Sequence, residues 1–358
     1  MEEAASPPTT PRLSSYGPRS VAVEKGVVGL PPLLSEGSRL RGRYKIVRVL
    51  SATRLRNMYL AEDQHLKGKH WVIRQMQPVG IDSGDRKWLI TQFEAEARML
   101  STLEHPSLPK LVDFFVQDLH LYVIREFVPG LDLNVILSQR SGRLSERDAL
   151  GIGFSLCELM NFLLKKKLPP IVFRELSLGN LVYTPDGQTK LIDFGFSRLF
   201  QREARLGAPD YAAPEQYAED ASIDGQTLVY NVGALMYHLM TGHNPGTTPF
   251  ALPPMQHHNP GISDRTVDLI EKAVSNERSQ RFASLADLAK ALQQILNSKP
   301  ARSKKKGGTQ RLEQIPLPGG GNFRVESKSG GFPWGMAVVV LLCLGAGSAV
   351  ALRYLGLL

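Results

Sequence analysis

The sequence is poor in cysteine. Its two cysteines, Cys157 and Cys343, lie far apart, one in a helical pattern and one in a hydrophobic run. Two isolated thiols provide neither a disulfide framework nor the ligand spacing of a metal cluster, so they exclude a disulfide-stapled scaffold and favour a reducing compartment. Hydrophobic residues make up 42% of the chain, which is enough for a sizeable globular core.

The sequence also lacks a basic surface interleaved with aromatic residues. The net charge is +9, but a dense part of the excess is confined to one short basic run between Lys299 and Arg311. The position of charge predicts a partner better than its total does. We therefore expect no nucleic-acid partner.

A signal peptide is not recognisable in the first residues. Glu2 and Glu3 stand where such a peptide has basic residues, and prolines and serines follow without an apolar core. This composition predicts that residues 1–39 form a disordered tail.

Charge is absent from one long segment, which runs from Gly331 to Leu352. A helix of this length spans about 33 Å, close to the hydrocarbon thickness of about 30 Å. Trp334 and Arg353 stand near its two ends, where aromatic and cationic residues meet the membrane interface. We predict that residues 331–353 form a single transmembrane helix that holds the protein to a membrane.

Two further expectations follow from this helix. Residues 298–330 read as a basic, glycine-rich linker, and by the positive-inside rule their charge places the preceding domain on the cytosolic side. Small residues from Gly345 to Ala349 are compatible with the pairing of two such helices. A homodimer through the membrane segment is therefore an open alternative to an unpaired helix.

Between the tail and the linker, the hydrophobic periodicity of the chain changes once, from strand-like to helix-like. Before residue 128 the apolar residues mostly alternate as in β-strands, whereas helical spacing dominates after Ser145. The expected strands are 44–50, 58–61, 71–75, 111–116 and 121–128, and the expected helices include 86–104, 229–240, 268–274 and 285–296. Capping boxes at Ser145 and Ser284 mark two helix starts. A small β-rich lobe before a larger helical lobe is an α+β, two-lobed fold, with Pro129-Gly130 at the joint.

A β-hairpin is predicted around Pro185-Asp186-Gly187. Asn180 precedes its first strand and Asp193 follows its second, so the hairpin brings these two residues to the same end. An amide oxygen and a carboxylate suit a hard cation such as Mg²⁺, which takes further ligands from phosphate groups. On spacing alone, a purely structural hairpin is the alternative.

The motifs around this hairpin resemble those of protein kinases. Residues 173–180, Phe-Arg-Glu-Leu-Ser-Leu-Gly-Asn, resemble the catalytic loop HRDLxxxN, while residues 193–195 match DFG and residues 213–215 match APE. Arg281 resembles the arginine that pairs with the APE glutamate. The resemblance covers about residues 43–297 and is closest to the bacterial serine/threonine protein kinases. It implies a small lobe at 43–128 and a large lobe at 129–297.

The resemblance also implies a nucleotide site with Mg-ATP as its cofactor. Asn180 and Asp193 would be the metal ligands, and Glu175 would take the position of the catalytic base. The nucleotide-binding positions belong to the glycine loop, the strand lysine, the helix glutamate and the hinge, and here they hold Ser51, Thr53, Arg56, Arg74, Glu96, Glu126 and Val128.

Departures from the family pattern concentrate where nucleotide and substrate bind. All three glycines of the loop are replaced, which removes backbone conformations that close over phosphates. Glu175 replaces an aspartate, Ser177 replaces a lysine, and Leu228 replaces an aspartate that braces the catalytic loop. Residues 193–215 contain no threonine, and Ala208 stands at the usual one, so activation through a loop threonine is excluded.

Two arginines lie near the predicted nucleotide pocket. Arg74 replaces the phosphate-anchoring lysine, and Arg125 stands at the gatekeeper position just before the hinge. Glu96 lies on the apolar face of its helix and needs a partner there. We expect Glu96 and these arginines to form a structural ion-pair cluster across the pocket, with Val72 narrowing the adenine slot further.

These features predict a membrane-anchored pseudokinase that serves as a signalling scaffold or interaction module for cytosolic signalling proteins. One alternative is a divergent active serine/threonine kinase, because Asn180, Asp193 and a carboxylate at position 175 remain. The other alternative is a nucleotide sensor that binds Mg-ATP without transferring phosphate.

Overall fold

The computed structural model describes residues 33–53, 56–77, 83–166, 176–193, 196, 209–217 and 224–298 of the chain. Most of the predicted tail, nearly all of the linker, the segment 331–353 and Glu175 lie outside these residues, so the expectations placed on them stay predictions. Within the described residues, no helix combines the length and apolar character that crossing a membrane requires.

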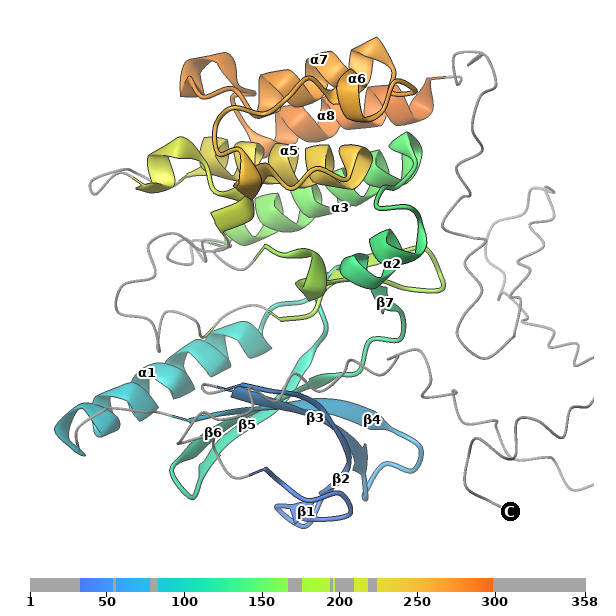
Figure 1. Ribbon diagram of the computed structural model, residues 1–358. Coiled ribbons are helices and arrows are strands. Elements are labelled where there is room, and N and C mark those ends of the chain that lie inside the picture. The colour runs from blue at the N-terminus through green and yellow to red at the C-terminus, as the bar shows by residue number, and fades with distance from the viewer. Residues whose placement is uncertain are drawn as a thin grey trace, which may run out of the picture.

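The small lobe is a curled antiparallel sheet with one long helix (Figure 1). Its strands lie side by side in the order β1-β2-β3-β4-β6-β5. The elements are β1 Arg39–Leu40, β2 Tyr44–Ala52, β3 Arg56–Asp63, β4 His70–Met76, α1 Ser83–Ser101, β5 Leu111–Gln117 and β6 His120–Glu126. Asp118 and Leu119, both with positive φ, form the two-residue turn between β5 and β6, a conformation that matches the twist of the flanking strands.

The two faces of this sheet carry different sets of buried residues. α1 packs on one face through Leu89, Phe93, Ala97 and Leu100, which recur every three or four positions. The opposite face holds a second core, composed of Leu40, Tyr44, Ile46, Tyr59, Ala61, Trp71, Ile73, Phe115, Tyr122 and Ile124. Because successive side chains alternate between faces, each strand residue can be assigned to the α1 side or to the second core.

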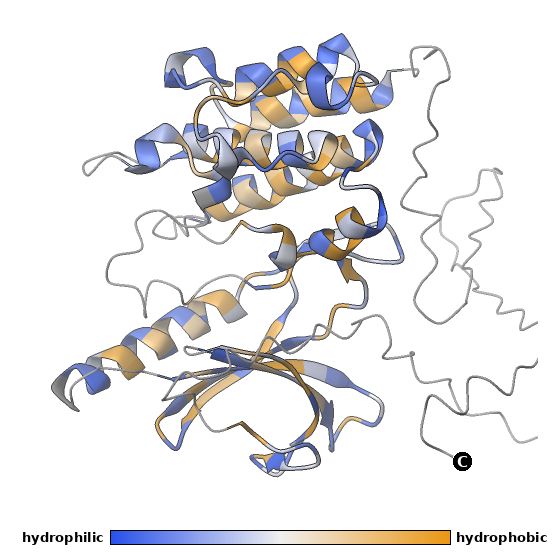
Figure 2. Ribbon diagram, in the orientation of Figure 1, coloured by the Kyte–Doolittle hydropathy of each residue, from blue (hydrophilic) through white to orange (hydrophobic). Residues whose placement is uncertain are grey.

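The large lobe is mainly helical and lies above the sheet in Figure 1. Its elements are β7 Leu131–Asp132, α2 Leu133–Gln139, α3 Glu146–Lys165, β8 Leu181–Tyr183, β9 Thr189–Leu191, α5 Gly225–Thr241, α6 Met255–His258, α7 Asp264–Ala273 and α8 Leu285–Asn297. The strands form a short sheet in the order β7-β8-β9. In Figure 2 the hydrophobic residues of α3, α5 and α8 gather where these helices face one another, and hydrophilic residues face outward.

α5 is the central helix of this lobe and is buried along nearly its whole length, because α3, α7 and α8 pack around it. Gly153 of α3 allows the closest approach, since a Cβ at this position would collide with the side chain of Met236. Asp224 and Thr227 form a capping box at the start of α5, and Gly242 ends it in the left-handed conformation.

The predicted two-lobed α+β fold is present, and most predicted elements are confirmed within a few residues. Ser145 and Ser284 cap α3 and α8 through their side chains, as their sequence patterns indicated. The helix expected at 268–274 begins earlier, at Asp264, because Ser263 caps it by accepting the amide hydrogen of Thr266. The sequence argument missed β1, β7 and α2, which are short and have little periodicity of their own.

Candidate functional site

Three arginines project from adjacent strands on the α1 side of the small-lobe sheet. Arg74 of β4 pairs in register with Val123, and Arg125 of β6 pairs with Val72, so the two arginines are diagonal neighbours on one face. Arg56 opens β3 opposite Met76, two residues beyond Arg74, and therefore shares that face as well. The strand registers thus bring three positive charges together.

All three guanidinium groups turn to the carboxylate of Asp193, which follows β9 in the large lobe. Arg74 Nη1 donates to Asp193 Oδ1 at 2.8 Å, and Arg125 Nη1 lies 3.8 Å from the same oxygen. Arg56 Nη1 donates to the other oxygen, Oδ2. We call Arg56, Arg74, Arg125 and Asp193 the arginine cluster.

The arginine cluster is buried except at one edge. Only 6% of the Asp193 side chain is exposed, and the Arg74 and Arg125 side chains are equally enclosed, whereas 37% of the Arg56 side chain is exposed. Burial by itself raises the pKa of a carboxyl group, yet the charges of Arg74, Arg56 and Arg125 outweigh that effect and hold the pKa of Asp193 below its ordinary value. Asp193 is therefore a stable carboxylate anion.

Glu96 makes a different contact. Its Oε1 accepts a hydrogen bond from the backbone N–H of Phe196 at 3.0 Å, and both residues are buried. The Phe196 ring packs against Phe93 of α1, with ring centroids 5.4 Å apart. The guanidinium carbons of Arg74 and Arg125 lie 5.9 Å and 5.8 Å from the centroid of the Phe196 ring, within the range of a cation–π contact.

The sequence argument expected an ion-pair cluster across the nucleotide pocket, with Glu96 as the carboxylate that the arginines bind. A cluster of arginines is present, but among the described residues Arg74 and Arg125 form their ion pairs with Asp193. The difference has a geometric reason. Glu96 Oε1 receives the Phe196 amide hydrogen, while Asp193 enters from the large lobe opposite the strand face that carries the arginines.

Two positions of the missing glycines, Thr53 and Arg56, are hydrogen-bonded to each other. The Thr53 hydroxyl donates to the Arg56 carbonyl at 2.9 Å and accepts from the Arg56 amide at 3.2 Å, so it fixes the start of β3. Ser51 pairs in register with Met58 next to an irregularity in β2. A hydroxyl-braced turn therefore points Arg56 into the cleft where the family has a flexible glycine loop.

The predicted hinge residues lie at the end of β6 and directly after it. Glu126 ends β6, pairs in register with Trp71 and lies 4.0 Å from Lys69 Nζ through its carboxylate. Val128 is buried. Gly130 then joins the lobes with a φ of 146°, and a Cβ at this position would collide with the carbonyl of Tyr183. The segment from Glu126 to Gly130 thus forms the hinge between the lobes.

The hairpin that carries Asn180 and Asp193 is confirmed. Leu181 pairs with Leu191, and the Ile192 amide donates to the Asn180 carbonyl at 2.8 Å, which brings Asn180 next to the residue that precedes Asp193. Gly187 provides the positive φ of the turn. The third predicted catalytic residue, Glu175, lies outside the described residues.

The fit of a magnesium ion depends on Asp193. Magnesium requires carboxylate oxygens at about 2.0–2.1 Å in near-octahedral geometry. Both Asp193 oxygens here accept guanidinium groups, and three cations would repel a fourth. The arrangement does not fit a metal ion at Asp193. Among the described residues, no group of three or more histidine, cysteine, aspartate or glutamate residues could hold one elsewhere.

The predicted ion pair between Glu215 of the APE motif and Arg281 is present. Arg281 Nη1 and Nη2 donate to the two Glu215 oxygens at 2.7 Å and 2.9 Å, a bidentate ion pair. Burial raises the pKa of Glu215, but the hydrogen bonds and charge of Arg281 dominate and hold it below its ordinary value. Leu228, at the position of the missing bracing aspartate, is buried in the large-lobe core.

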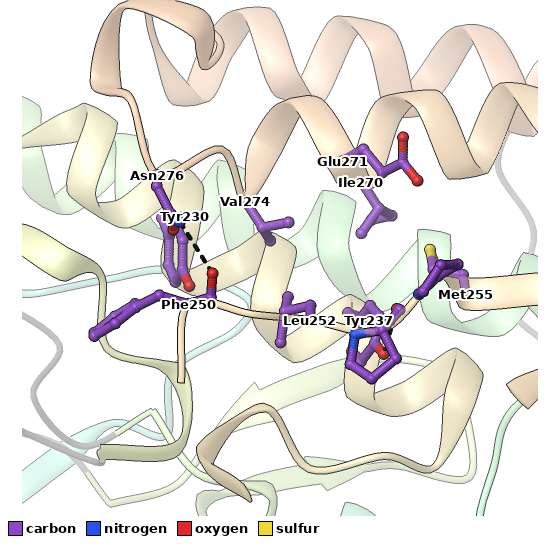
Figure 3. Close-up of a pocket in the computed structure, with 11 residues that line it drawn as sticks. Tyr230, Tyr237, Phe250, Leu252, Met255, Ile270, Glu271, Val274 and Asn276 are labelled. Atoms are coloured by element: carbon purple, nitrogen blue, oxygen red, sulfur yellow. Dashed lines mark hydrogen bonds between the residues drawn. The ribbon is translucent and has the colours of Figure 1, made fainter. Parts of the chain in front are cut away.

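A separate hollow of about 250 Å³ lies in the large lobe between α5, α7 and the segment that leads into α6 (Figure 3). Its walls are largely apolar and aromatic, with Tyr230, Phe250 and Leu252 among them. The Asn276 amide donates to the Phe250 carbonyl at 3.0 Å and fixes one wall. The hollow contains none of the sequence-predicted site residues.

Comparison with known proteins agrees with the two-lobed fold. The family model described as the protein kinase domain matches residues 59–301. This match covers more than half of the chain, and the chain belongs to the protein kinase family.

Bacterial serine/threonine-protein kinases are among the matching relatives. The chain is 28% identical to serine/threonine-protein kinase PknA of Mycobacterium tuberculosis, over 82% of this chain and 71% of PknA. It is 26% identical to serine/threonine-protein kinase PrkC of Bacillus subtilis, over 70% of this chain but only 40% of PrkC. The match therefore covers less than half of the length of PrkC.

Solved structures share the fold. The kinase domain of Mycobacterium tuberculosis PknI superposes with a TM-score of 0.58 at 23% identity, covering 73% of this chain and 99% of that domain. The apo form of PpkA-294 gives the same TM-score at 20% identity and covers 99% of that chain. At these identities the likeness concerns the fold alone, which is that of a two-lobed protein kinase.

Phe196 is the site residue that the sequence argument missed. It follows the Asp193-Phe194-Gly195 motif, where attention falls on the motif itself, and the sequence offers only a second phenylalanine beside the glycine. Its complete burial against α1 depends on tertiary packing. The hydrogen bond to Glu96 could not be predicted because its donor is a backbone amide, which every residue but proline carries.

Proposed function

We propose that this protein is a membrane-anchored pseudokinase, a kinase-fold module that binds cytosolic signalling proteins and does not transfer phosphate. The observation that carries the proposal is the environment of Asp193. In a working kinase this aspartate holds magnesium. Here its two oxygens accept guanidinium groups from Arg56 and Arg74, with Arg125 close by.

Other positions support the same conclusion. The turn at Thr53 and Arg56 is braced by hydroxyl hydrogen bonds, so it lacks the freedom that the glycine loop uses to cover phosphates. The arginine at position 74 is engaged with Asp193 instead of being available to phosphates. Positioning supplies most of the catalysis in phosphoryl transfer, and these replacements act on the positioning groups.

Thermal unfolding of the full chain in a mild detergent, with millimolar ATP and either Mg²⁺ or EDTA, tests the proposal. A ligand at one hundred times its Kd stabilises a folded protein by about 2.7 kcal/mol, which is a shift of several degrees. We expect no shift with Mg-ATP. A magnesium-dependent rise in Tm that is lost in Asp193→Asn would contradict the proposal.

A divergent active kinase is the second candidate, favoured by two observations. The hairpin that sets Asn180 beside the residue before Asp193 is intact, and so is the Glu215–Arg281 pair. Under this candidate, label from γ-labelled ATP would enter a generic protein substrate and would not do so in Glu175→Gln. Binding of Mg-ATP without such transfer would instead identify a nucleotide sensor.

Membrane attachment is part of the proposal and rests on the sequence of residues 331–353. The uncharged run is long enough to cross a bilayer, and the basic linker before it favours a kinase-like domain on the cytosolic side. Small residues between Gly345 and Ala349 support a homodimer through this helix as an additional feature.

A further inference from the structure

The segment that begins at the last residue of β9 forms hydrogen bonds or ion pairs with the small lobe at four of its residues, 191, 192, 193 and 196. The Leu191 amide donates to the Ser107 carbonyl, in the loop between α1 and β5, at 2.9 Å. The next residue, Ile192, accepts a hydrogen bond from Arg125 Nη1 at 3.2 Å through its carbonyl oxygen. Asp193 is then held in the arginine cluster, and the Phe196 amide donates to Glu96.

These contacts come from opposite lobes. The arginines belong to the six-stranded sheet and Glu96 to α1, whereas residues 191–193 continue the short sheet that β7 and β8 build in the large lobe. The backbone connects the two lobes covalently through the hinge at Gly130. A second, non-covalent connection on the cleft side therefore restricts rotation about the hinge.

We propose that residues 191–193 and 196, together with the three arginines and Glu96, form a latch that holds the two lobes in one fixed orientation without any nucleotide or metal. The latch takes the bridging position between the lobes that a metal-bound nucleotide has in a working kinase. This inference rests on the proposed function, because an Asp193 that ligated magnesium would not hold the arginine cluster.

The charges explain why the latch depends on Asp193. Two guanidinium groups, those of Arg74 and Arg125, are almost fully buried, and the Asp193 carboxylate compensates for the cost of removing them from water. Without that negative charge, the arginines repel one another across neighbouring strands. Opening the cleft then relieves the repulsion by returning the arginines to solvent.

Arg56 has a separate position in the latch. Its side chain is partly exposed at the rim, and it binds the Asp193 oxygen that faces away from Arg74. Its removal leaves the inner pairs in place, so its contribution is smaller than that of Asp193. We therefore expect Asp193→Asn to weaken the latch strongly and Arg56→Gln to weaken it mildly.

The distance between the lobes measures the latch directly. Spin labels at Leu119→Cys, in the exposed β5–β6 turn, and at Gln293→Cys, on the exposed side of α8, report it by pulsed electron resonance in the full chain. Cys343→Ser removes the cysteine that lies outside the described residues, and Cys157 is buried. We expect one narrow distance distribution for the parent protein, unchanged by Mg-ATP.

The variants have matched controls. Asp63→Asn removes another buried carboxylate that binds an arginine, Arg43, but this pair lies entirely within the small lobe. Arg98→Gln removes an exposed arginine from a pair within α1 and is the control for Arg56→Gln. We expect Asp193→Asn to broaden and lengthen the distribution and Arg56→Gln to do so less. Both controls should keep the parent distribution.

A folded Asp193→Asn variant with the parent distance distribution would overturn the latch. Should that variant fail to fold, an Arg56→Gln distribution identical to that of Arg98→Gln would overturn it instead. Failure of the proposed function has a different signature, because Mg-ATP would then stabilise the parent protein. The two outcomes are read from separate measurements, so failure of the latch alone is distinguished from failure of the proposed function.

Discussion

Arg74 Nη1 lies 2.8 Å from Asp193 Oδ1, and this ion pair joins the middle of the small-lobe sheet to the strand end of the large-lobe hairpin. Both side chains are almost completely buried. A buried pair of this kind is expensive to break, because the partner left behind is an uncompensated charge. The residue that the family uses to bind phosphates is here a structural partner of the residue that the family uses to bind metal.

Restoring family residues should reopen the site. In the triple variant Arg56→Gly, Arg74→Lys and Arg125→Leu, Asp193 loses all three guanidinium partners and gains one compact ammonium group nearby. We expect a lower Tm without ligand and a Tm that rises with Mg-ATP by several degrees. The same triple change with Asp193→Asn is the control. A folded triple variant that ignores Mg-ATP would count against the arginine cluster as the cause of lost binding.

The Glu215–Arg281 pair should contribute strongly to the free energy of unfolding. Removing either partner, in Glu215→Gln or Arg281→Met, is expected to cost about 3–5 kcal/mol because the other partner is left buried without compensation. Urea unfolding of a double-mutant cycle measures the coupling, and the double variant should cost less than the sum. The exposed pair Glu94–Arg98 is the comparison, with a coupling below about 1 kcal/mol.

Acid should destabilise the domain in a defined direction. The pKa values of Asp63, Asp193 and Glu215 are lowered in the folded state by their arginine partners, against the opposing effect of burial. Each contribution is complete above the unfolded pKa of about 3.9–4.3 and is lost as the pH falls through the lower folded value. Urea midpoints measured from pH 6 down to pH 3 should therefore decrease, and Glu215→Gln should flatten the decrease. An unchanged slope in that variant would contradict the assignment.

Membrane attachment should depend on residues 331–353. A chain that ends at residue 330 is expected to move from the membrane pellet to the soluble fraction after an alkaline carbonate wash, because the apolar segment has been removed. Deleting only residues 354–358 is the matched control and should leave the protein in the pellet. Val340→Lys places a charge in the middle of the segment and should weaken attachment. Retention of the shorter chain in the pellet would show that attachment lies elsewhere.

Much of the fold could be predicted because the periodicities are local. The helix expected at 86–104 is α1 at Ser83–Ser101, and the Pro185-Asp186-Gly187 turn indicated the β8–β9 hairpin. β7 could not be found in this way, because two residues have no period and become a strand only by pairing with β8. The turn at Asp118-Leu119 was also hidden, since neither residue is glycine or asparagine.

The sequence predicted which residues belong to the site but not which carboxylate binds which arginine. The resemblance to protein kinases assigned Arg74 to the position of the strand lysine and Arg125 to the gatekeeper position, and helical spacing placed Glu96 on the inward face of its helix. Which carboxylate meets which arginine depends on how the lobes close, and that is a property of packing between segments more than a hundred residues apart in sequence. The same limit applies to Phe196, whose amide reaches Glu96 across the lobes.

The arginine cluster draws on three different strands, β3, β4 and β6, and this origin has an evolutionary consequence. Within the proposed function, a substitution at any one of these positions leaves Asp193 with two guanidinium groups and still no place for a metal. The first steps back toward phosphate transfer would therefore lower stability without restoring activity. Under the proposed function, the loss of catalysis is one that single substitutions do not reverse.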